Sequence, residues 1–216
     1  MPVLLAMLVV ASASLTPRVP VRPSLDLVVE LEHGVDLPRQ DLDAVSRELT
    51  TIWSPLIDLH VILPGDRTRP GADDVVRMTI TTRTLDGRES NGLGWIDFLD
   101  EVPQPAITIS TSALSRLIAT GSWNHRAIAT LPPHAARMAL RHGLARAAAH
   151  ELGHYLLRST AHARTGLMRA QFSCDDLFDA RAGATRLEPD QIARLTGTDV
   201  LIARHNDEPA GVADSR

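Results

Sequence analysis

The pattern of apolar and polar positions predicts strands in the first half of the chain. Five short segments alternate or are mostly apolar, and turn residues bound them, as expected of strands. They span residues 27–31, 59–63, 75–84, 91–98 and 107–110. A turn at Asp86-Gly87 should separate the third strand from the fourth. Between the first two strands the apolar spacing changes to three and four, which predicts a helix over residues 40–53 that ends before Pro55.

The second half of the chain is predicted to be mainly helical. Pro132-Pro133 favours the start of a helix, and one uninterrupted helix is expected over residues 134–158. A short helical piece at 113–119 and a polar loop precede it and resemble an insertion. A last helix is expected within 186–197, because Ile192 and Leu195 have helical spacing and Gly197 is typical of a helix end.

The long helix carries the sequence His150-Glu151-Leu152-Gly153-His154. A step of four residues returns to nearly the same side of a helix, so both imidazoles would lie on one face, where they could hold one metal ion. Catalytic zinc has three protein ligands and keeps a fourth position for water. We expect His162 to supply the third ligand after a chain reversal, and Glu151 to act as the general base.

Other residues leave alternatives open for this site. Glu188 is a rival third ligand, since some zinc peptidases use two histidines and a glutamate. His125, His134 and His142 are expected at the surface or behind the ligands, because eight-residue steps drift around a helix. His60, inside a predicted strand, is expected to be half-buried and structural. The alternative for the whole motif is a buried helix whose histidines are only hydrogen-bonded.

Composition narrows the class of protein. A chain of 216 residues with 44% hydrophobic residues can bury one core, so we expect one domain with two lobes. The formal net charge is −4 and aromatic residues make up 3%, which argues against a nucleic-acid partner. The only cysteine, Cys174, cannot form an internal disulfide.

The start of the chain has the pattern of an export signal. An apolar run over residues 3–10 is too short to span a bilayer, and the small residues Ala11-Ser12-Ala13 resemble a cleavage site. We therefore expect a signal peptide over 1–13 and a proline-containing extended linker over 14–24. The mature protein would be secreted or periplasmic, without stable membrane insertion.

The segment from His150 to His154, followed by His162 and Gly166-Leu167-Met168, resembles the active-site segment of the metzincins, which are zinc endopeptidases. The resemblance implies three histidine ligands to Zn²⁺, Glu151 as the base and Met168 beneath the metal. Two features depart from the family pattern. Arg158 stands where the family has a turn glycine, and His162 follows His150 by twelve residues rather than ten.

The resemblance also implies a fold and a function. The fold would be α+β and zincin-like, with a mixed five-stranded sheet, a long active-site helix and a small C-terminal lobe. The peptidase domain would span 25–216, with an upper lobe over about 25–158 and a lower lobe over about 159–216. Its fourth strand would be the sheet edge along the cleft and could pair with an extended peptide. The expected function is a secreted zinc-dependent endopeptidase acting on peptides or proteins, and the alternative is a non-hydrolytic zinc-binding protein.

Overall fold

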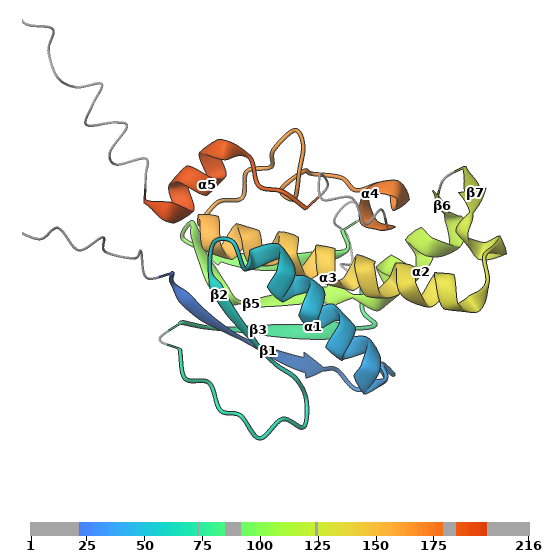
Figure 1. Ribbon diagram of the computed structural model, residues 1–216, viewed down its shortest axis with the longest axis horizontal. Coiled ribbons are helices and arrows are strands. Elements are labelled where there is room, and N and C mark those ends of the chain that lie inside the picture. Colours follow the sequence, from blue (N-terminus) through green and yellow to red (C-terminus); the bar gives the residue numbers. More distant parts are fainter. Residues whose placement is uncertain (1–21, 73, 85–91, 124, 179–184, 198–216) are drawn as a thin grey trace, which may run out of the picture.

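The computed structural model describes residues 22–72, 74–84, 92–123, 125–178 and 185–197. A five-stranded sheet lies on one side, and helices α1 and α3 cover one of its faces (Figure 1). The strands are β1 (Ser24–Leu31), β2 (Asp58–Ile62), β3 (Asp74–Thr81), β4 (Gly94–Leu99) and β5 (Val102–Ser110). Their order across the sheet is β2-β1-β3-β5-β4. The predicted signal peptide at 1–13, most of the predicted linker and the turn at Asp86-Gly87 lie outside the described residues.

The sheet is mixed, as predicted. Neighbouring strands are parallel except for β4, which pairs antiparallel with β5 and forms one edge. Alternate residues of the central strands, such as Leu27, Met78 and Ile107, are buried toward the helices, which is the period-two pattern seen in the sequence. The expected α+β architecture, with a mixed five-stranded sheet and one long helix, is therefore confirmed.

Strand β5 begins five residues earlier than predicted, and two prolines explain the difference. Pro103 and Pro105 made the first half of this strand look like a loop, since proline cannot donate a hydrogen bond to a neighbouring strand. The pairing of β5 with β3 begins only at Ala106, so residues 102–105 have β4 as their single neighbour. A half-paired segment tolerates proline where a central one would not.

Helix α1 (Arg39–Trp53) matches the predicted span, and α3 (Pro133–Leu157) is the long helix. Charged residues join the two helices at their contact. Asp41 on α1 pairs with Arg141 on α3, and Glu48 accepts a hydrogen bond from Arg146 and contacts His142 at 2.6 Å. These pairs neutralise charges that partial burial would otherwise make costly.

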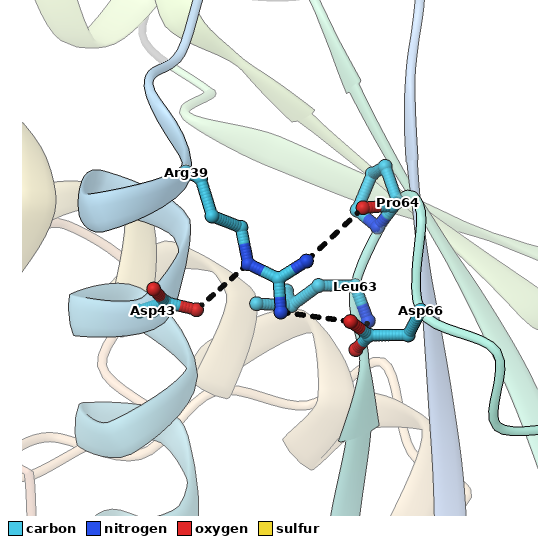
Figure 2. Close-up of polar contacts among 5 residues, drawn as sticks. All are labelled: Arg39, Asp43, Leu63, Pro64 and Asp66. Atoms are coloured by element: carbon cyan, nitrogen blue, oxygen red, sulfur yellow. Dashed lines mark hydrogen bonds and ion pairs between the residues drawn. The ribbon is translucent and has the colours of Figure 1, made fainter.

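The start of α1 is also tied to the loop that follows β2. Figure 2 shows the guanidinium group of Arg39 between this helix and the loop. It donates to Asp43 Oδ1 at 2.9 Å, to the carbonyl oxygen of Pro64 at 3.2 Å and to Asp66 Oδ1 at 2.8 Å. Asp66 in turn accepts the backbone N–H of Leu63 at 3.0 Å.

The expectation for His60 in β2 was wrong in one respect, because its side chain is exposed rather than half-buried.

The segment between β5 and α3 is more ordered than the sequence predicted. Helix α2 (Thr111–Thr120) is longer than expected, and a small hairpin follows it, formed by β6 (Ser122–Trp123) and β7 (Arg126–Ala127). A 3₁₀ turn, η1 (Ile128–Thr130), leads to α3. Beyond α3, α4 (Cys174–Phe178) was not predicted, and α5 (Pro189–Thr196) falls inside the predicted last helix. None of the described helices has the length and apolarity needed to cross a membrane.

Candidate metal centre

His150 and His154 lie one turn apart on α3, and both are buried, with exposures of 7% and 5%. The predicted common face is therefore present. Their ring centroids are 4.7 Å apart with the ring planes nearly perpendicular. The Nε2 atoms of the two rings face each other at 3.0 Å.

The other ring nitrogens define the tautomers. His150 Nδ1 lies 2.8 Å from the carbonyl oxygen of Leu167, and His154 Nδ1 lies 2.6 Å from that of Ser159. A carbonyl oxygen only accepts, so we infer that each Nδ1 carries the hydrogen and each Nε2 presents a lone pair. Ligating histidines commonly donate their second ring nitrogen to a carbonyl or carboxylate in this way.

Two lone pairs facing each other at this distance need a positive group between them. A proton is a poor candidate, because burial lowers the pKa of His150 to about 4 and also lowers the pKa of His154. A metal ion fits better, since two nitrogen ligands of tetrahedral zinc lie about 3.3 Å apart. The pair therefore has the chemistry and approximate spacing of two metal ligands.

His162 completes the predicted set of three. Its ring centroid lies 5.3 Å from that of His150 and 4.9 Å from that of His154, although its side chain is exposed. Each of the three histidines offers one nitrogen, and these nitrogens all lie within 4.8 Å of one another. The structure thus brings together the three residues selected from the sequence, and their binding of a metal stays a prediction.

The chain reversal between α3 and His162 occurs without the turn glycine of the metzincin pattern. Arg158 adopts φ 48° and ψ 48°, the left-handed conformation that glycine accepts most easily. Its neighbour Ser159 donates its backbone N–H to the carbonyl oxygen of His154 at 3.2 Å. Arginine therefore makes this turn in place of glycine.

The loop from Ala163 to Met168 packs against α3 next to the two helix histidines. Ala163 donates its backbone N–H to the carbonyl oxygen of Met168 at 2.7 Å, which closes the loop between them. The Met168 side chain is fully buried against α3 at Gly153, where an added Cβ would overlap its sulfur. Met168 thus lies beneath the helix turn that carries both histidines, which is the place implied by the metzincin resemblance.

Glu151 lies at the edge of a cleft beside the histidines. Its side chain is 8% exposed, and burial raises its pKa to about 8. The Glu151 side chain is close to the edge strand, because a Cβ added at Gly94 of β4 would come within 3.0 Å of Glu151 Cγ. Glycine at this position leaves the room that the glutamate side chain needs.

Glu188, the rival third ligand, lies outside the histidine cluster. One carboxylate oxygen accepts the hydroxyl of Thr165 at 2.9 Å and the backbone N–H of Thr165 at 3.3 Å. Gln191 on α5 accepts the backbone N–H of Glu188 at 3.0 Å, which caps that helix. Glu188 therefore fastens the loop after His162 to α5. His134 and His125 are exposed and His142 contacts Glu48, so these three also lie apart from the cluster.

The cleft has a volume of about 690 Å³. Sequence reasoning missed several residues that build it. Helix α2 forms one wall and the segment 170–172 another, with the Phe172 ring edge-on to His150 at 5.4 Å between centroids. The carbonyl groups that hold His150 and His154 were missed as well. A backbone carbonyl has no sequence signal, whereas Phe172 stood out as an apolar residue in a polar stretch.

Comparison with known proteins supports the fold. No family model and no curated protein matches this chain. Among solved structures, a zinc-dependent peptidase from Methanocorpusculum labreanum is similar at a TM-score of 0.50 and 12% identity, covering 79% of this chain and 99% of that one. Archaemetzincin from Methanopyrus kandleri has a TM-score of 0.49 and 12% identity over 86% of this chain and 99% of that one.

Metalloproteinase-II from Bacteroides fragilis has a TM-score of 0.45 at 15% identity and covers 82% of this chain; this chain spans 53% of that protein. At such low identities the likeness to the Methanocorpusculum structure concerns the fold alone. The chain therefore shares its α+β fold with that protein, and its three clustered histidines could hold a metal ion.

Proposed function

We propose that this protein is a zinc-dependent endopeptidase. The observation that carries the proposal is the pair of Nε2 atoms of His150 and His154, which lie 3.0 Å apart while each Nδ1 is within hydrogen-bond distance of a backbone carbonyl oxygen. The fold supports it too, because a neighbour with this fold is described as a zinc-dependent peptidase. A buried carboxylate next to the first histidine supplies a proton acceptor.

His150, His154 and His162 would hold the zinc ion, which when bound polarises a carbonyl group and lowers the pKa of a water molecule. Glu151 would take a proton from the attacking water and pass it to the leaving amine. Its raised pKa makes this carboxylate a stronger base than an exposed one, although a nearby cation would draw the pKa back down.

Strand β4 offers a way to hold the substrate. It pairs with β5 on one side and is the edge of the sheet among the described residues, so backbone groups on its free side are available to an extended peptide. Gly92, Leu93 and Gly94 line the cleft at the start of this strand, next to Glu151. A peptide added there would run past the histidines.

Metal content and hydrolysis measured together test the proposal. The purified parent should hold one zinc ion per chain and cleave an unfolded protein substrate. Glu151→Gln should keep zinc and lose at least about a hundredfold in cleavage rate, since general-base catalysis typically contributes that much. His162→Ala and His150→Ala should lose zinc, whereas His134→Ala, an exposed histidine on the same helix, is the matched control and should retain it.

The outcomes separate the two functions. Zinc bound with no cleavage of any peptide would favour the non-hydrolytic alternative. Full activity in Glu151→Gln would refute the assigned mechanism, and zinc retained by His162→Ala would displace the third ligand.

We also infer that the protein works outside the cytoplasm. The support is the apolar run at 3–10 followed by Ala11-Ser12-Ala13. Expression with and without residues 1–13, followed by N-terminal sequencing of the exported product, tests this. A product that stays in the cytoplasm or keeps its first residues would contradict it.

A further inference from the structure

Helix α2 presents one face to the cleft beside the histidines. Four of its residues line the cleft, Ala113, Arg116, Leu117 and Thr120. Their spacing of three and four residues is that of one helix face. The insertion predicted from the sequence therefore forms a wall of the site.

This wall is held in a fixed position at both ends. At its start, the Ser110 hydroxyl accepts the backbone N–H of Ala113 at 3.1 Å. Leu114 of α2 is fully buried against α3, where a Cβ added at Gly143 would come within 2.7 Å of the Leu114 Cδ2 atom. At the other end, Gly121 leaves room for the sulfur of Cys174 on α4. A side chain on the cleft face of α2 is thus displayed from a rigid element.

Arg116 is the charged residue that α2 contributes to the cleft. Its side chain is exposed, and it makes no ion pair with any acidic residue in the described ranges. Apart from Glu151, the other described residues that line the cleft are uncharged or are the histidines of the site. A guanidinium group that lines a substrate cleft without a carboxylate partner is available to bind one from a ligand.

We propose that Arg116 is a specificity-determining residue that favours peptides with a carboxylate group near the scissile bond. This inference rests on the proposed function and names its substrate class. The carboxylate could be a Glu or Asp side chain, or the free C-terminus of a short peptide. An exposed ion pair of this kind should give about a two- to fivefold preference.

Matched peptide pairs test the inference. One series carries Glu or Gln at each position on either side of the cleaved bond, and a second carries a free or an amidated C-terminus. The kcat and KM are measured with the zinc-loaded parent, and binding of the same peptides to Glu151→Gln is measured by fluorescence anisotropy. The expected result is a lower KM and tighter binding for the anionic member at one position, or for the free C-terminus.

Variants of Arg116 assign the effect to this residue. Arg116→Gln should abolish the preference, Arg116→Glu should reverse it, and Arg116→Lys should retain part of it. Arg137→Gln, an exposed arginine on α3 that does not line the cleft, is the matched control and should leave the preference intact.

The results distinguish this inference from the proposed function. If the parent shows the same KM and the same affinity for both peptides of every pair, the role of Arg116 is overturned. A preference that survives in Arg116→Gln overturns it as well. Glu151→Gln could bind the peptide with a carboxylate more tightly, and lose this preference when Arg116 is also replaced. That result would support the inference even if the zinc-loaded parent cleaved nothing. The lack of cleavage would then count against the proposed function alone.

Discussion

Gly153 is the position where a single methyl group should disturb both stability and metal binding. It lies on α3 between His150 and His154, directly above Met168. A Cβ at this position would overlap Met168 Sδ, lie 3.1 Å from its Cε and lie 3.7 Å from Trp53 Cζ2. Met168 and Trp53 have exposures of 0%, so neither side chain can move out into solvent.

Two effects of opposite sign decide the stability of Gly153→Ala. Helix propensity alone favours alanine over glycine by about 1 kcal/mol. Overpacking a well-filled core costs about 1–3 kcal/mol. We expect the overlap to win and the free energy of unfolding to fall by about 1 kcal/mol. A displaced Met168 would also shift the neighbouring carbonyl of Leu167, which holds His150, so zinc affinity should fall by about tenfold or more.

Chemical denaturation of the protein after a chelator has removed its metal measures the free energy of unfolding. Competition for zinc between the protein and a chelator measures the zinc affinity. The propensity contribution is calibrated by the difference between Ser115→Ala and Ser115→Gly, at an exposed position in the middle of α2. Gly153→Ala should cost less in a Met168→Ala background, because the overlap is then gone. A Gly153→Ala protein about 1 kcal/mol more stable than the parent, with unchanged zinc affinity, would refute the reasoning.

Three further predictions concern the same site. Arg158→Gly should raise the free energy of unfolding by about 0.5–1 kcal/mol in chemical denaturation, because glycine adopts a positive φ without strain; an unchanged or lower value would contradict this. Gly94→Ala should lower the free energy of unfolding by about 1–3 kcal/mol and reduce hydrolysis of an unfolded protein substrate. The reason is that the new Cβ would lie 2.7 Å from Ile109 Cδ1 and 3.0 Å from Glu151 Cγ. A stability and a hydrolysis rate equal to those of the parent would exclude this crowding. In the chelated protein, the pKa of Glu151 is about 8 folded and 4.5 as the reference value, so the native state binds more protons in between and stability falls as pH rises through this window. Glu151→Gln should therefore gain stability over the parent from about pH 4.5 to 8, by up to about 5 kcal/mol. A pH-independent difference in denaturation experiments would contradict the burial of this carboxylate.

Long periodic segments were predictable because their burial is one-sided. The alternation in β1 and β3 and the spacing in α1 report which face meets the core, and the structure buries those faces. The first half of β5 was missed because proline is read as a strand breaker, and only the pairing register shows that this half has one neighbour. Short elements such as α4 have too few residues for a period to be detected.

The part of the site that depends on side-chain identity was predictable from the sequence. The four-residue step between His150 and His154 follows from helix geometry, and a chain reversal was enough to suggest His162. The partners Leu167 and Ser159 act through carbonyl oxygens, which every residue has, so no residue type could reveal them. The role of Glu188 likewise depends on where Thr165 lies in the folded chain.

The longer spacing before His162 is compatible with the cluster because the extra residues are used in a turn. Ala161 donates its backbone N–H to the Ser159 hydroxyl at 3.1 Å, so the segment folds back locally instead of extending away from α3. The ring of His162, however, makes no hydrogen bond within the described part of the chain, whereas both helix histidines are fixed by carbonyl groups. In the proposed zinc site, the two helix histidines would be oriented before the ion binds, whereas His162 would become oriented on binding. The ordering of His162 should therefore make the zinc affinity lower than at a site with three fixed ligands.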